Sequence, residues 1–112
     1  MKEERVLFNF VIGRPEDVVT TVLRKISALT RESKVRWFKI GITRDPQERF
    51  RKHKRYYDRM IVVYSSSSIR CVRELEFELI EHNRDLADNF IGGGGGRSGS
   101  PPYFMYVVVK GW

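Results

Sequence analysis

The sequence has little cysteine and no long apolar run, and each shortage excludes a class of protein. Its 112 residues include a single cysteine, Cys71, which rules out an internal disulfide or a zinc site made of several cysteines. We expect Cys71 to be a small packed residue. Every apolar stretch is shorter than the roughly 18 residues that a membrane-spanning helix needs. Acids at Glu3 and Glu4 make the start a poor secretory signal. The length predicts one domain over residues 1–112. The other features predict a protein of the cytoplasm or nucleus that has no membrane partner.

Two familiar motif classes are also missing. The sequence has no HExxH and no lysine at the P-loop position after its glycines. Gly94, Gly96 and Gly99 satisfy the GxGxxG spacing, but they follow a predicted helix and precede a predicted strand, which reverses the order of a dinucleotide site. Two interpretations of this segment stay open: a flexible loop, or a loop whose amides and Arg97 meet a phosphate.

Positive charge, in contrast, is plentiful. Lys and Arg total 21 against 14 Asp and Glu, which gives a net charge of +7, and such a surface attracts polyanions without specific contacts. Much of this charge lies between residues 44 and 59, where Tyr56 and Tyr57 are interleaved with it. The basic residues there are Arg44, Arg49, Arg51, Lys52, Lys54, Arg55 and Arg59. A basic helix with aromatic residues is typical of nucleic-acid binding, and a merely solvated helix face is the alternative.

Hydrophobic periodicity predicts alternating strands and helices. Strands are expected at 6–12, 37–43, 60–64 and 103–110, and helices at 15–29, 46–54 and 69–82. Asp45 is expected to cap the second helix in a capping box closed by Glu48, and Ser68 to cap the third. The periodicity does not fix the strand directions.

The third predicted helix carries a carboxylate on its apolar side. Glu76 lies four residues after Val72 and four before Ile80, within the inward stripe. Glu74, Glu78 and Glu81 fall on the outer face. A carboxylate that faces the interior needs a cation or hydrogen-bond donors. An ion pair with an arginine, or a position at the edge of the stripe, is the alternative to a functional role.

The second predicted helix pairs an arginine with a histidine. Arg49 and His53 are four residues apart and therefore share a face. An arginine binds a phosphodiester in a bidentate manner that lysine cannot match. His53 is a candidate proton carrier, and a structural or solvated histidine is the alternative.

These residues resemble a known family. The run Phe38-Lys39-Ile40-Gly41-Ile42-Thr43, followed by Asp45-Pro46-Gln47-Glu48-Arg49 and ending at His53, resembles the second half of the GIY-YIG nuclease motif, in the variant with Lys-Ile-Gly as its second triplet. The family's helix arginine lies ten residues after the start of that triplet, as Arg49 lies after Lys39. Its metal-binding glutamate precedes an aliphatic residue by four, like Glu76, and its asparagine follows about a dozen residues later, like Asn89.

The resemblance implies a metal-dependent DNA endonuclease on a small α/β sandwich, with a central, mainly antiparallel sheet flanked by helices. Arg49 would hold the scissile phosphate, Glu76 would bind Mg²⁺ or Mn²⁺, and Lys39 and His53 would complete the catalytic set. The residues expected to contact nucleic acid are Arg44, Arg51, Lys52, Lys54, Arg55, Tyr56, Tyr57, Asn89 and Arg97.

The chain departs from the family pattern at its first strand. The family's first triplet includes a tyrosine that helps to activate water, whereas Phe8 or Phe10 would stand there in this chain. A whole extra helix also separates the first two strands. Phenylalanine cannot relay a proton, so Tyr56, Tyr57, Tyr64 or His53 would have to substitute. Two alternatives therefore stay open: a weak or inactive nucleic-acid-binding module derived from a nuclease, or a domain that binds an acidic protein.

Overall fold

A computed structural model describes residues 5–31, 35–83 and 100–111 of the chain. All seven predicted elements form, with bounds within about two residues of those expected. They are β1 (Val6–Val11), α1 (Pro15–Thr30), β2 (Trp37–Thr43), α2 (Pro46–His53), β3 (Arg59–Ser66), α3 (Ile69–His82) and β4 (Tyr103–Lys110). The predicted glycine loop, with Asn89 and Arg97, lies outside the described residues.

The strands form one mixed sheet in the order β1-β3-β4-β2. β1 pairs with β3 in parallel, whereas β4 is antiparallel to both β3 and β2. The predicted α/β class is confirmed. β1, on which the resemblance would place the family's first triplet, is an edge strand, and the neighbour of β2 is β4. The last strand therefore occupies the interior of the sheet.

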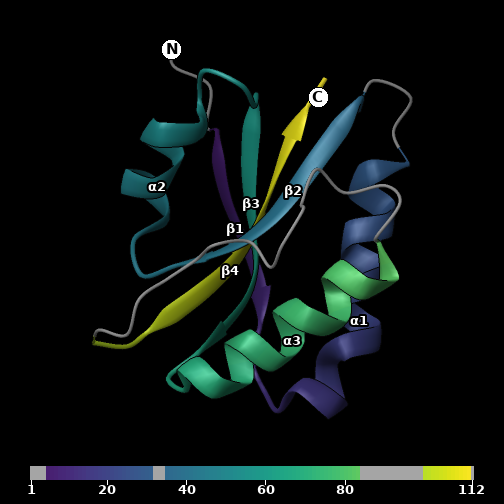
Figure 1. Cartoon of the computed structure of the whole chain (residues 1–112), viewed down its shortest axis with the longest axis vertical. Helices are drawn as coiled ribbons and strands as arrows, with labels where there is room; N and C mark the ends of the chain where they lie inside the picture. The colour runs from purple at the N-terminus through teal and green to yellow at the C-terminus, as the bar shows by residue number, and fades with distance from the viewer. Residues whose placement is uncertain (1–4, 32–34, 84–99, 112) are drawn as a thin grey trace.

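Helices cover both faces of this sheet (Figure 1). α1 and α3 pack against each other, and α3 also contacts β2, β3 and β4. α2 lies apart from them and contacts β1 and β4. Side chains of β4 alternate between the two layers, since Val107 and Val109 join the core under α1 and α3, whereas Tyr106 and Val108 join a smaller core with Phe50 of α2. The smaller core is the one beside the basic helix.

The turn into α1 requires a glycine. Gly13 has a φ of +138°, and a Cβ there would lie 3.0 Å from Cγ1 of Val18. Pro15 occupies the first turn of α1, where its fixed φ and missing N–H suit the helix start. A larger residue at position 13 would be strained both by its backbone and by this contact.

The predicted helix caps form, with one correction. The Asp45 side chain accepts a hydrogen bond from the Glu48 amide at 3.1 Å, and the Ser68 hydroxyl accepts one from the Cys71 amide at 3.2 Å. Each cap contributes about 1 kcal/mol. The capping box at α2 does not close, because the Glu48 carboxylate pairs with Arg51 at 3.1 Å. The Asp45 amide instead donates to the Thr43 hydroxyl at 3.1 Å.

Candidate active site and nucleic-acid interface

A buried tyrosine lies at the centre of the candidate site. Tyr106 of β4 is opposite Gly41 of β2 and, on its other side, opposite Val62 of β3. A side chain at position 41 would collide with the Tyr106 phenol. A glycine within a strand often marks the close approach of another group, and here that group is the phenol. Gly41 thus provides the space in which the Tyr106 hydroxyl lies.

Two residues of α2 converge on this hydroxyl. His53 Nε2 lies 3.0 Å from the Tyr106 oxygen, and the charge and hydrogen bonding of nearby Arg49 act on the phenol. The contact between Nε2 and the phenol is a hydrogen bond whose donor depends on which ring nitrogen of His53 carries the proton. The predicted shared face of Arg49 and His53 is confirmed, and buried Phe50 between them anchors the helix to the sheet.

The electrostatic surroundings keep His53 neutral. Burial and, to a lesser extent, the nearby charges of Lys39 and Arg49 together lower the pKa of His53 from its ordinary value of 6.5 to about 4. The ring therefore carries one proton at neutral pH, and a neutral imidazole accepts through the nitrogen that lacks it.

Tyr106 stays protonated for a related reason. Burial raises the pKa of its phenol above the ordinary value, the charge and hydrogen bond of Arg49 oppose this rise, and the charge of Glu76 adds to it. The other three predicted catalytic residues influence the Tyr106–His53 pair electrostatically, because Lys39 and Arg49 lower the pKa of His53, while Arg49 and Glu76 act on the pKa of Tyr106.

Glu76 lies on the buried side of α3, as its spacing predicts. Only 8% of the residue is exposed, whereas Glu74, Glu78 and Glu81 are exposed. Within the described ranges, no group of three or more His, Cys, Asp or Glu side chains is placed to hold a metal ion. A single carboxylate still fits Mg²⁺, which is commonly bound by one or two carboxylates, water and substrate phosphate. Such a site would fill jointly with the substrate.

A hollow of about 750 Å³, called the basic hollow below, adjoins His53. It is lined by Trp37, Lys39, Lys52, His53, Arg55, Tyr56, Tyr57 and Lys110. None of these described residues is acidic. Lys110 forms an ion pair with Asp58 at 3.5 Å, which leaves the charges of Lys39, Lys52 and Arg55 to face an anion. The hollow is therefore electropositive.

The residues predicted to bind nucleic acid divide into three groups. Lys52, Arg55 and exposed Tyr56 line the basic hollow. Arg44 and Lys54 are exposed outside it, and the guanidinium of Arg51 pairs with Glu48.

Tyr57 lies in the wall of the basic hollow. It is only 6% exposed and packs edge-on against His53, with 5.7 Å between the ring centroids. The Tyr57 ring therefore supports the histidine. Tyr64, a predicted substitute for the missing tyrosine, belongs to the core on the other side of the sheet.

Sequence reasoning missed Tyr106, Trp37 and Lys110. Tyr106 lies in the last strand, whereas the resemblance places the family's tyrosine position in the first strand, at Phe8 or Phe10. The signal that points to it is Gly41, since a glycine in an apolar strand indicates a close neighbour. Trp37 and Lys110 lie opposite each other at the ends of β2 and β4, a pairing that requires the strand order to be known.

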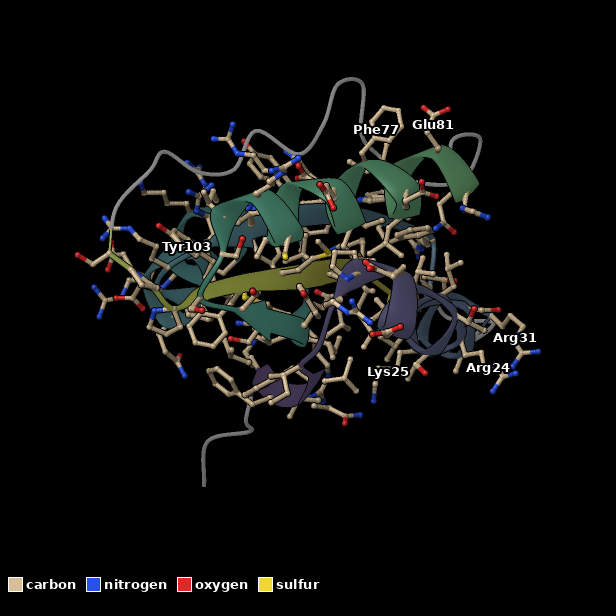
Figure 2. The ribbon with its side chains drawn as sticks, turned by 90° about the horizontal axis from the view of Figure 1, so that it is seen from below. Arg24, Lys25, Arg31, Phe77, Glu81 and Tyr103 are labelled. Atoms are coloured by element: carbon tan, nitrogen blue, oxygen red, sulfur yellow. The ribbon has the colours of Figure 1, made fainter. Side chains whose placement is uncertain are left out.

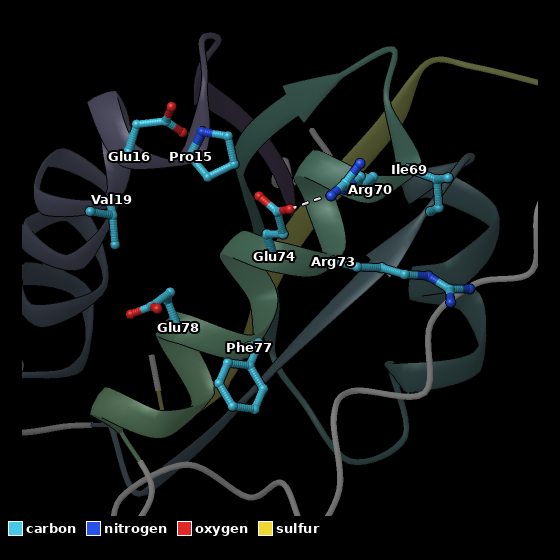
Figure 3. A pocket seen from close by; sticks show the side chains of 9 residues that line it. All are labelled: Pro15, Glu16, Val19, Ile69, Arg70, Arg73, Glu74, Phe77 and Glu78. Atoms are coloured by element: carbon cyan, nitrogen blue, oxygen red, sulfur yellow. Dashed lines mark hydrogen bonds and ion pairs between the residues drawn. The ribbon is translucent and has the colours of Figure 1, made fainter.

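A second hollow, between α1 and α3, has a different character. Its volume is about 1150 Å³, and its lining includes Glu16, Glu74 and Glu78 as well as Arg70 and Arg73. Figure 3 shows Glu74 turned toward Arg70, with which it pairs at 3.3 Å. Figure 2 shows Phe77 and Glu81 on the outer side of α3. This groove has mixed charge and does not suit a polyanion.

Comparisons of the chain with protein-family models, curated proteins and solved structures give no match. In residues 5–31, 35–83 and 100–111, no helix is both long and apolar enough to cross a membrane. Three features support a function: the group of Tyr106, His53 and Arg49 (the Tyr106 cluster), the basic hollow, and the resemblance of residues 38–53 to a nuclease motif.

Proposed function

We propose that the protein is a divalent-metal-dependent endonuclease that hydrolyses phosphodiester bonds in DNA inside the cell, in the cytoplasm or nucleus. The observation that carries this proposal is the convergence of Arg49 and neutral His53 on the buried phenol of Tyr106. The resemblance of residues 38–53 to half of the GIY-YIG motif supports the same reaction. The lone cysteine and the net charge of +7 suit an intracellular partner of nucleic acid.

Arg49 and Lys39 are the proposed phosphate ligands. A guanidinium has five N–H donors, so a hydrogen bond to Tyr106 leaves others for phosphate oxygens. Lys39 is half-buried on β2 and close enough to lower the pKa of His53. Two cations beside one scissile phosphate stabilise the charge that develops on it during attack by water.

Tyr106 and His53 form the proposed proton relay. As water attacks the phosphorus, one proton of the water passes to the neutral imidazole of His53, which lines the hollow and is held by the buried Tyr106 hydroxyl. The P–O bond to the leaving oxygen then breaks, and that oxygen takes a proton from solvent. Because the pKa of His53 is about 4, the resulting imidazolium returns its proton to solvent rapidly. General base catalysis of this kind is worth about 10²–10⁴ in rate.

Glu76 is the proposed protein ligand of Mg²⁺ or Mn²⁺. When bound, the ion supplies charge stabilisation at the phosphate and the leaving oxygen. The Glu76 residue is only 8% exposed, and a buried carboxylate is stabilised by a nearby cation. That environment favours a cation that the substrate phosphate shares.

Nicking of supercoiled plasmid with Mg²⁺, Mn²⁺ or EDTA tests the proposal. Wild type is expected to nick only with metal, and Glu76→Gln and Arg49→Gln to lose about 10²-fold or more in rate. Glu74→Gln and Arg70→Gln are matched controls, because they alter an exposed ion pair on α3, and they should nick like wild type. Metal-dependent nicking by Glu76→Gln at the wild-type rate would refute the assignment.

The same assay separates the two alternatives. A plasmid that is shifted on a gel but never nicked would identify a nucleic-acid-binding module, and that binding should weaken steeply with salt. A protein that binds no plasmid, and whose acidic protein partner is not displaced by a DNA duplex, would be an interaction domain.

A further inference from the structure

We propose that the basic hollow binds one unpaired nucleotide of the strand, with its base stacked on Trp37 and Tyr56. The substrate would then be single-stranded or locally opened nucleic acid. This inference rests on the proposed function for the position of the scissile phosphate, beside Tyr106.

The hollow and the Tyr106 cluster share a wall. His53 lines the hollow and contacts the Tyr106 phenol at 3.0 Å. Gly41, Lys39 and Trp37 are alternate residues of β2, so they follow one another along the face that α2 covers. The strand rise places Trp37 about 13 Å from Gly41. A strand whose phosphate lies at Tyr106 and Lys39 therefore leads its next nucleotides toward Trp37.

Two aromatic residues of the hollow, Trp37 and Tyr56, are exposed to solvent to an unusual extent for their type. Trp37 is 42% exposed and Tyr56 is 65% exposed, although both have large apolar rings that gain by leaving water. Stacking of bases on such rings is independent of sequence, because every base has a flat π-face. Lys39, Lys52 and Arg55 line the same hollow and supply charge for the flanking phosphates. The aromatic rings therefore suit the base of a nucleotide, and the neighbouring cations suit its phosphate.

The requirement for an unpaired base follows from access. A base in a duplex is stacked on both sides, so its face reaches an aromatic side chain only after it leaves the helix. The hollow measures about 750 Å³, within the usual range of pockets that enclose a small molecule. It therefore has room for one extruded or single-stranded nucleotide.

Fluorescence of Trp37 provides a direct test of stacking. The chain has two tryptophans, so a Trp112→Phe background leaves Trp37 as the sole indole. Titration with a single-stranded oligonucleotide in EDTA, which prevents metal-dependent cleavage, is expected to quench this fluorescence. In a series of oligonucleotides with one abasic site moved along the strand, one position should lose the quenching.

Binding affinity provides the second test. By fluorescence anisotropy in EDTA, Trp37→Leu is expected to bind the single strand about 5- to 100-fold more weakly, whereas Trp37→Phe keeps most of the affinity. Affinity for a fully paired duplex should not change. Phe77→Leu is the matched control, because Phe77 is 66% exposed on α3, in the other helical layer. It should bind both substrates like wild type.

Several outcomes would overturn the inference. Unquenched Trp37 would do so, as would equal losses of single-strand and duplex affinity in Trp37→Leu. Equal quenching by free adenosine monophosphate would make the hollow a mononucleotide site.

The nuclease and the stacking site can fail separately. Glu76→Gln should abolish nicking and keep the quenching. Nicking without quenching refutes the stacking site alone, and quenching without nicking refutes the nuclease alone.

Discussion

The Tyr106 hydroxyl can be tested against a matched tyrosine in the same sheet. Tyr106 and Tyr64 are both fully buried, on opposite faces. The Tyr64 hydroxyl donates to the carbonyl of Gly13, whereas the Tyr106 hydroxyl joins His53 and Arg49. Replacing either tyrosine with phenylalanine removes one oxygen and keeps the ring. The two variants therefore differ in the site that they alter and not in the chemistry of the change.

The expected stability loss is similar for both variants. A net hydrogen bond is worth about 0.5–1.5 kcal/mol. Tyr106→Phe removes the hydrogen bond to His53, which is only partly buried, so water replaces part of what His53 loses. We expect the free energy of unfolding, measured by urea denaturation, to fall by about 1 kcal/mol in each variant. Domains of this kind usually have about 5–15 kcal/mol, so both variants remain folded.

The expected activities differ sharply. Tyr106→Phe should lower the rate of metal-dependent plasmid nicking by about 10²–10⁴, which corresponds to about 3–5 kcal/mol in the activation barrier. Tyr64→Phe should nick at nearly the wild-type rate. Equal rates in the two variants would refute the proton relay. A Tyr106→Phe protein that has lost about 3 kcal/mol of stability would instead show that the hydroxyl is structural.

Two further predictions concern the neighbours of Tyr106. Gly41→Ala places a methyl group against the phenol, and we expect overpacking to cost about 1–3 kcal/mol in urea denaturation and to reduce nicking as the hydroxyl is displaced. The pKa of His53 is lowered to about 4, so the folded state binds fewer protons than the unfolded state between pH 6.5 and 4. The free energy of unfolding should therefore fall as pH falls through this window, by about 1–2 kcal/mol after allowance for solvent screening of a partly exposed ring.

Each of these predictions has its own control. A Gly41→Ala/Tyr106→Leu double variant should be more stable than the sum of the two single changes allows, because the smaller side chain relieves the clash; additive losses would contradict the contact. His53→Gln should flatten the pH dependence of unfolding between pH 6.5 and 4. An unchanged slope in that variant would assign the effect to other groups.

The helices and strands were predictable because their signals are local. Proline and a capping residue begin α2, Ser68 caps α3, and glycine precedes α1. Each feature acts within one turn, so the sequence around it suffices. The capping box failed for an equally local reason, since Glu48 had a competing partner in Arg51.

The strand order and the full site were not predictable in the same way. The pairing of β4 with β2 joins residues 61 to 73 positions apart, from Thr43 with Phe104 to Trp37 with Lys110, and no periodicity within either strand specifies it. Arg49, His53 and Glu76 were identified from helical spacing, which is local. Tyr106 comes from the distant strand, so its place opposite Gly41 follows only from the topology.

The interior position of β4 also has a consequence for protein synthesis. β2, at residues 37–43, has β4 as its partner in the sheet, and β4 begins at Tyr103. A ribosome that adds about 5–20 residues per second needs several seconds to travel between them. During that interval the nascent β2 has no neighbour on which to form its ladder, and its unpaired edge is open to other chains. A chaperone that holds this segment during translation would protect the very strand that later makes room for Tyr106.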